Sequence, residues 1–288
     1  MSCYMEAGLY GTIYTTLKRQ RKETMNKLHI LLYFCIFQCL LAYGQDMTGR
    51  EILDEQNNRH GSETEYTKEK MTLIDGSGNQ EVRLIRRFSK EMSEDEIRFL
   101  VVFDSPNSIK GTALLTWAYD GGESDQWMFL PAQNRLQRIA RGNKKSYFMG
   151  TDFTFEDMEP EDLDNFDYEI IDEVQISGLD CWMIKASPNN PQTRQTSSYG
   201  YRVLYILRDY FFTVKIEFYD RRGVKIKTQQ NGLLKKIDGQ RFRANKIIMT
   251  NHESNHRTTI DFISREIDEP LGDSIFTERY VTSGRHLQ

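Results

Sequence analysis

Apolar and polar residues alternate with a period of two along most of the chain beyond residue 60. This alternation is typical of β-strands, because successive side chains on a strand point to opposite faces of the sheet. Turn sequences such as Asp120-Gly121-Gly122 and Ser177-Gly178 separate many of the segments, which favours antiparallel neighbours. The pattern predicts strands at 66–75, 81–92, 95–105, 111–120, 125–131, 167–176, 179–186, 201–209, 211–220, 223–234, 242–251 and 257–267.

We expect these segments to form a mainly β (α+β) fold, with a single strongly curved antiparallel sheet of about ten or eleven strands. Such a sheet curls into an incomplete barrel, and its concave face must be filled by side chains, covered by a few helices or left for a ligand. Thr48 is placed to cap a helix at 49–59, a second short helix is expected at 160–165, and Asp273 is placed to cap a third at 273–280.

The first 44 residues differ from the rest of the chain. An apolar run of 14 residues, Leu28–Leu41, is followed by small residues at Ala42 and Gly44. This layout predicts a signal peptide at 25–44, an upstream extension at 1–24 and a single mature domain at 45–288. Because a membrane-spanning helix needs about 20 apolar residues, we expect an exported, periplasmic protein. Anchoring to a membrane through an uncleaved N-terminal segment is the alternative.

Charge and cysteine content limit the partners and the source of stability. Removing residues 1–44 changes the net charge from −4 to −7, which disfavours a nucleic-acid partner. Of the four cysteines only Cys181 remains, so no disulfide can form within the mature chain. The sequence therefore predicts a chain that is stabilised by a packed core, with Cys181 as a buried apolar residue. We also expect a monomer.

Four segments resemble a known family. They are DSPNSIKGTALLTW, WMFLPAQNRLQRI, YFMGTDFTFEDM and DSIFTERYV. In combination they are similar to the LolA-like outer-membrane lipoprotein-sorting proteins, and the similarity extends from Gly49 to Val281. The resemblance implies a half-barrel with an apolar cavity for acyl chains, closed by helices. It implies a carrier or chaperone that moves lipoproteins or lipids towards the outer membrane. By analogy, its partners are an inner-membrane exporter of the resistance-nodulation-division type and an outer-membrane acceptor.

A carrier of this kind needs an apolar wall, a movable cover and a polar rim. Aromatic residues and methionines concentrate between Lys110 and Asp157, and the strand before this block adds two candidates. The candidate wall residues are Phe99, Val101, Leu115, Trp117, Trp127 and Phe129. The candidate cover residues are Phe148, Met149, Phe153 and Phe155, with Gly150 as a flexible point. The candidate rim residues are Arg135, Arg138 and Arg141. Their default interpretation is a solvated sheet edge, and the sharper hypothesis is contact with an anionic head group or a membrane. Several strands are apolar on both faces, so the pattern does not say which face meets a ligand.

Motifs for catalysis are absent from the sequence. It contains no G-x-S-x-G, H-E-x-x-H, Walker or G-x-G-x-x-G motif, and the acidic run at 152–173 lacks the spacing of a calcium loop. We therefore expect no enzyme activity, metal or cofactor. Two alternatives remain. One is a regulatory module on the same fold that senses lipids or lipoproteins. The less favoured one is a lipid or glycan hydrolase with convergent polar groups in its cavity.

Overall fold

The computed structural model describes residues 47–287, and a compact unit begins at Thr48. The predicted signal peptide lies outside the described residues. The unit contains a single antiparallel sheet with the strand order β6-β5-β4-β3-β2-β1-β13-β12-β11-β10-β9-β8-β7. The strands are β1 (Thr64–Ile74), β2 (Gln80–Ser93), β3 (Glu96–Ser105), β4 (Ala113–Tyr119), β5 (Asp125–Leu130), β6 (Arg135–Arg138), β7 (Phe166–Ile176), β8 (Leu179–Pro188), β9 (Tyr201–Leu207), β10 (Phe212–Tyr219), β11 (Lys225–Asp238), β12 (Arg241–Asn251) and β13 (His256–Ile267).

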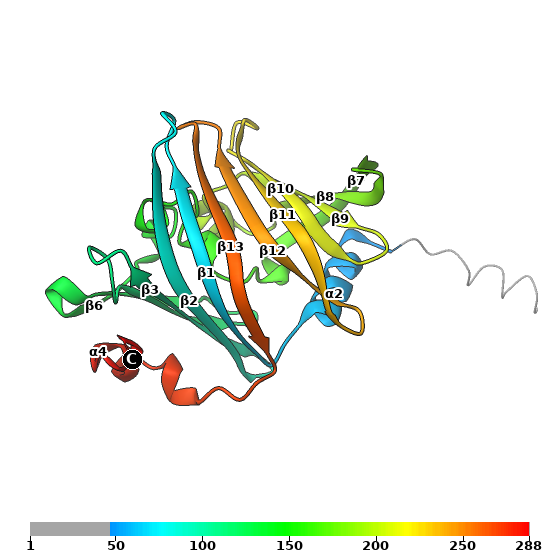
Figure 1. Cartoon of the computed structure of the whole chain (residues 1–288). Helices are drawn as coiled ribbons and strands as arrows, with labels where there is room; N and C mark the ends of the chain where they lie inside the picture. The colour runs from blue at the N-terminus through cyan, green and yellow to red at the C-terminus, as the bar shows by residue number, and fades with distance from the viewer. Residues whose placement is uncertain (1–46, 288) are drawn as a thin grey trace, which may run out of the picture. The chain divides into compact units, whose positions relative to one another are not determined.

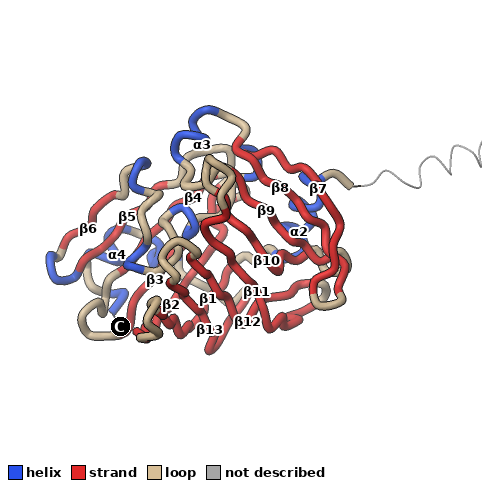
Figure 2. Tube along the Cα trace, turned by 90° about the horizontal axis from the view of Figure 1, so that it is seen from above, coloured by secondary structure: helices blue, strands red, loops and turns tan. Residues whose placement is uncertain are grey.

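The sheet is two meanders joined in its middle. Strands β1 to β6 form one half and β7 to β13 the other, and the pairing of β1 with β13 joins them. Figure 2 shows the strands bending round from β6 to β7, with the ends of the sheet apart. The predicted curved, unclosed sheet is confirmed, but it has 13 strands instead of ten or eleven. All twelve segments predicted from the alternation are strands, and the thirteenth is β6, a short and mostly polar edge strand that lacks this apolar alternation.

The helices are short. They are α2 (Gly49–His60), α3 (Pro191–Thr196) and α4 (Glu278–Thr282), and the 3-10 turns are η1 (Pro131–Gln133), η2 (Arg141–Asn143), η3 (Phe148–Gly150), η4 (Glu156–Met158), η5 (Leu163–Asn165), η6 (Asp273–Phe276) and η7 (Arg285–Leu287). Between residues 47 and 287, no helix has the length and apolar character needed to cross a membrane.

Two of the predicted helix caps have different outcomes. Thr48 caps α2 as expected, through a capping box with Glu51. The helix begins against β7, where a side chain on Gly49 would place its Cβ 2.7 Å from the carbonyl oxygen of Tyr168. The prediction that Asp273 caps the start of the C-terminal helix is wrong. The cap of α4 is Thr277, whose side chain accepts a hydrogen bond from the backbone of Tyr280, because a 3-10 turn and a break precede the helix.

Strand register gives β3, β4 and β5 two apolar faces. Residues that lie directly opposite each other on neighbouring strands share a face. Val101 is opposite Leu114 on one face, and Leu100 is opposite Leu115 on the other. We call the first the inner face, since residues 146–158 pack on it, and the second the outer face, since residues 271–287 pack on it. In Figure 1 the C-terminal segment with α4 lies beside β6.

Candidate functional site

The cover segment, residues 146–158, is a tight loop on the inner face. Tyr147 and Thr154 form an isolated antiparallel bridge, and the backbone N–H of Phe148 donates to the carbonyl of Phe153 at 2.7 Å. The chain reverses at Met149 and Gly150, whose φ angles are +50° and +73°. Gly150 adopts this left-handed conformation without steric cost. The loop therefore presents several apolar side chains to the sheet together.

Those apolar side chains are part of the inner core. Phe148 is fully buried, with its ring 5.6 Å from the ring of Phe103 on β3 and 5.6 Å from that of Phe155. Phe153 and Met158 are buried in the same cluster, and Met149 packs at its edge. Of the predicted cover residues, three are thus core residues of the half-barrel. Their expected movement stays a prediction.

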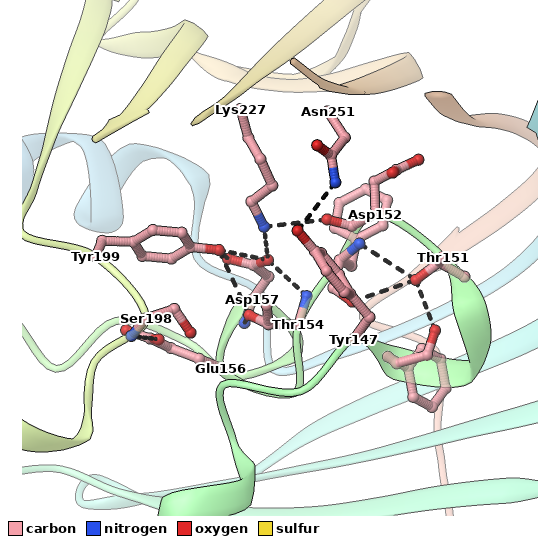
Figure 3. Close-up of polar contacts among 12 residues, drawn as sticks. Tyr147, Thr151, Asp152, Thr154, Glu156, Asp157, Ser198, Tyr199, Lys227 and Asn251 are labelled. Atoms are coloured by element: carbon pink, nitrogen blue, oxygen red, sulfur yellow. Dashed lines mark hydrogen bonds and ion pairs between the residues drawn. The ribbon is translucent and has the colours of Figure 1, made fainter. Parts of the chain in front are cut away.

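A buried ion pair fastens the cover segment to β11. The Lys227 ammonium lies 2.7 Å from Asp157 Oδ2 and also donates to the carbonyl of Asp152. Both charged side chains are almost completely buried. The Tyr199 hydroxyl and the backbone N–H of Thr154 donate to the same Asp157 carboxylate. Figure 3 shows these groups converging between the loop and the sheet. Burial, together with the nearby Asp157 charge, raises the pKa of Tyr199 well above its ordinary value, so this hydroxyl stays protonated and donates.

Further anchors come from both halves of the sheet. On β13, Thr258 Oγ1 donates to Asp152 Oδ2 at 2.7 Å, and His256 Nδ1 lies 2.7 Å from the same oxygen. On β2, Arg83 donates to the carbonyl of Met149, and on β5, Gln126 donates to that of Phe155. Because buried polar groups without partners are costly, this network holds one loop position strongly.

A pocket of about 380 Å³ lies between the cover segment and the middle strands. We call it the sheet pocket. Its volume lies within the range of about 300–1,000 Å³ that small-molecule sites usually occupy. Part of its wall is apolar and part is charged or polar. The apolar lining residues are Phe99, Phe153, Met158, Phe212, Ala244, Ile247, Ile260 and Phe262, and the charged ones are Glu65, Arg87, Asp157, Arg243 and Arg265.

A cleft of about 1,040 Å³ lies on the other side of the cover segment. It is lined by the β4–β5 turn, residues 156–162, α3 and strands β9 to β11. Its acidic residues, Glu123, Glu156, Asp157, Glu159, Glu161 and Asp162, outnumber its basic residues, Arg141, Lys144 and Arg202. Asp157 and Gln229 line both the cleft and the sheet pocket, so the cover segment is the partition between them.

The six predicted wall residues do not share a face. Phe99 and Val101 are on the inner face, and Phe99 lines the sheet pocket. The other four lie on the outer face, because their strand partners place them with Leu100: they are Leu115, Trp117, Trp127 and Phe129. The C-terminal segment covers them, and Trp117 Nε1 donates to the carbonyl of Phe276 at 3.0 Å. A common apolar wall made of all six is therefore wrong, because the register of β3 to β5 places the first two side chains and the other four on opposite faces of the sheet.

The three predicted rim arginines also separate. Arg135 and Arg138 lie on the edge strand β6, exposed, and Arg138 pairs with Asp125. Arg141, in η2, pairs with Glu123 and is the one of the three that lines the cleft. The default interpretation of a solvated edge fits Arg135 and Arg138, because β6 is the last strand of the sheet.

Sequence reasoning missed the charged groups on the inner face. Arg83 and Arg87 alternate with Ile85 on β2, and Lys227 occupies the inner face of β11. The sequence does contain a signal for them: a charged residue two positions from an apolar one on the same strand shares its face. Such a position places a charge inside a curved sheet. The pairing partners lie 70 residues or more away in some cases and give no local signal, as for Lys227 and Asp157.

Among the described residues, three aspartate side chains come close together. Oxygens of Asp120, Asp162 and Asp164 lie within 4.8 Å of one another near η5. Asp162 already accepts hydrogen bonds from the backbone N–H of Asp164 and the side chain of Asn165. These bonds account for Asp162 as a turn residue, so the group supports no metal assignment.

The unclosed sheet, with the cover segment packed on its inner face, is the architecture of a LolA-like half-barrel. A family model described as an uncharacterized protein matches residues 95–283, more than half of the chain, and the chain belongs to that family. No curated protein matches the sequence. Solved structures share the fold over most of the chain, and the predicted kinship with the LolA-like outer-membrane lipoprotein-sorting group is confirmed.

Three of these structures illustrate the similarity. A domain from Vibrio parahaemolyticus, described as an outer membrane lipoprotein-sorting protein, is 27% identical with a TM-score of 0.76 and covers 81% of this chain and 98% of its own. A DUF1329 family protein from Desulfovibrio piger is 24% identical with a TM-score of 0.76, covering 81% and 97%. A LolA superfamily protein from Nitrosomonas europaea is 18% identical with a TM-score of 0.64, covering 82% and 100%.

Proposed function

We propose that the protein is a carrier that binds acyl chains of lipoproteins or lipids inside its half-barrel. The observation that carries this proposal is the sheet pocket, which has an apolar wall on the concave side of a LolA-like sheet and the cover segment above it. Transfer of one acyl methylene from water to such a wall contributes about 0.8 kcal/mol. A chain of ordinary length is therefore bound mainly by burial, without specific bonds along it.

The cover segment gives the carrier its means of loading. It separates the sheet pocket from the cleft, and its apolar side chains occupy the concave space next to the pocket. Displacement of the segment joins the two spaces and exposes apolar surface for a longer acyl chain. The left-handed turn at Met149 and Gly150 is the point about which we expect the loop to move.

The proposal includes a place in the cell and a direction of transfer. The predicted signal peptide supports export, and the lipoprotein-sorting description of the Vibrio structure supports cargo directed to the outer membrane. An inner-membrane exporter as donor and an outer-membrane protein as acceptor belong to the same proposal, by analogy. The carrier acts without chemistry on its cargo.

Native mass spectrometry tests the proposal on protein purified from an exporting host, together with displacement of a fluorescent fatty-acid probe. We expect bound acyl-containing species of unchanged mass. Ala244→Phe, which fills part of the sheet pocket, is expected to weaken probe binding about tenfold. Ala132→Phe adds the same ring at an exposed position outside the pocket and serves as the control. Absence of any acyl species and of probe binding contradicts the carrier, and a cleaved probe favours the hydrolase instead.

A further inference from the structure

Three arginines lie side by side on the inner face of the sheet, where they line the sheet pocket. In the register of the sheet, Thr67 on β1 is opposite Arg87 on β2 and opposite Arg265 on β13, and the next strand, β12, contributes Arg243. All three line the pocket. Inward-facing arginines on a concave apolar surface are unusual, because charged groups are rarely placed inside unless they are paired.

The carboxylates next to these arginines are too few to neutralise them. Glu65 is shared by Arg243, at 2.9 Å, and Arg265, at 2.7 Å, and Glu69 pairs with Arg87 at 3.1 Å. The remaining acid of the pocket wall, Asp157, already pairs with Lys227. The three guanidinium groups therefore share two carboxylates, Glu65 and Glu69. Burial lowers the pKa of Arg265, with Glu65 opposing this shift and Arg243 adding to it.

Arg87 differs from the other two arginines in its hydrogen bonds. Arg243 uses its terminal nitrogens for the carbonyl of Phe242 and the hydroxyl of Ser62. Arg265 uses its own for Asn245 and the carbonyl of Ala244. Arg87 pairs with Glu69 through Nε, and its terminal nitrogens donate to no other described residue. A guanidinium whose two terminal nitrogens are free is suited to a bidentate contact with a carboxylate or phosphate through those two nitrogens.

We infer that the sheet pocket binds the anionic group of an amphiphile, a carboxylate or a phosphate, at Arg87, with Arg243 and Arg265 supplying the positive surroundings. This inference rests on the proposed carrier function and names its ligand class. The apolar side chains that line the same pocket, Phe99, Ile247, Ile260 and Phe262 among them, receive the start of the acyl chain. The cleft, where acidic residues outnumber basic ones, is less suited to such a group.

The test compares two probes with the same dansyl group and alkyl chain, 11-(dansylamino)undecanoic acid and its methyl ester, of which only the acid carries a negative carboxylate. Both are measured by fluorescence titration at pH 8. Arg87→Gln is expected to weaken binding of the acid about tenfold and to leave binding of the ester unchanged. Glu69→Gln, which removes a neighbouring negative charge, is expected to strengthen binding of the acid. The control is Lys68→Gln, which removes one positive charge from an exposed residue next to Glu69 on β1. We expect it to change the binding of neither the acid nor the ester.

Each outcome bears on the inference. Equal binding of acid and ester, unchanged in Arg87→Gln and Glu69→Gln, overturns the anionic site and leaves the carrier intact, whereas binding of neither probe contradicts the carrier itself. Displacement of the acid by inorganic phosphate at equal concentration assigns the pocket to a free anion and also overturns the inference. If Arg87→Gln fails to fold, the double variant Arg87→Gln with Glu69→Gln replaces it, since it leaves no unpaired charge. The double variant is expected to bind acid and ester equally.

Discussion

Two chain segments cover the two faces of the same strands, and they do so with different chemistry. On the outer face of β3 to β5, the C-terminal segment at 271–287 buries Phe276 and Val281 against Leu100, Leu115 and Phe129. On the inner face, the cover segment at 146–158 also buries aromatic rings, but it adds a buried ion pair and several buried hydrogen bonds.

This difference indicates different roles for the two covers. The outer cover is held mainly by apolar packing, with single hydrogen bonds such as the one from Trp117 to Phe276. Apolar packing weakens gradually as contacts are removed. A buried ion pair is costly when one partner is removed, yet the pair as a whole adds little net stability over apolar residues of the same size. The outer cover therefore behaves as core, and the inner cover is held in one position by a few strong contacts that can be broken together. No cavity adjoins the C-terminal segment among the pockets described above, whereas the inner cover has one on each side.

The largest expected effect comes from breaking the inner anchor. Lys227→Met leaves the buried Asp157 without its cation, and we expect it to lower the free energy of unfolding by about 3–5 kcal/mol. Lys227→Met combined with Asp157→Asn removes both charges and should recover most of this loss. Urea denaturation measures both. The matched control is Lys225→Met on the same strand, whose half-exposed pair with Glu217 is worth at most about 1 kcal/mol. Equal effects of Lys225→Met and Lys227→Met contradict the anchor.

The second effect separates the two faces. Phe276→Ala removes a fully buried ring from the outer seal and is expected to cost about 3–5 kcal/mol, without altering binding of the fatty-acid probe to the folded protein. Phe153→Ala, which removes a ring from the wall of the sheet pocket, should change probe affinity as well as stability. Weaker probe binding in Phe276→Ala, measured where both variants remain folded, places the binding site on the outer face instead.

The smallest effect is a pH dependence confined to the inner cover. Burial raises the pKa of Glu159, just beyond the cover segment, above its ordinary value of 4.5, with Lys144 opposing the shift. Because the folded-state pKa is the higher one, the contribution of this group to stability is fully present below about pH 4.5 and is lost as pH rises through the raised pKa. Hydrogen exchange of residues 146–158, corrected for the intrinsic rate, should therefore become faster from pH 4 to 7. Exchange of residues 271–287 should stay level, and Glu159→Gln should abolish the dependence.

How far the sequence could predict the site is clearest from Leu115 and Val101. Alternation correctly paired each residue with others two positions away on its own strand. It could not relate one strand to the next, because a shift of register by one residue exchanges the two faces. Thus Val101 proved to be on the inner face and Leu115 on the outer face. The FMGTDFTFED motif, by contrast, can be found from the sequence because its density of aromatic residues is a local property, and the structure buries its phenylalanines in the inner core. Its role as a cover stays a prediction.

By itself, the sequence determined the curved antiparallel sheet, the capped first helix and the two apolar faces of β3 to β5. These follow from side-chain periodicity and from capping and turn residues that act within a few positions of one another. Only the tertiary structure decided which apolar face is sealed by the C-terminal segment and which adjoins a pocket. It also brought Lys227 to Asp157 and placed Arg87, Arg243 and Arg265 together. Charges that lie far apart in the chain meet only when strand register and sheet curvature place them on one concave surface.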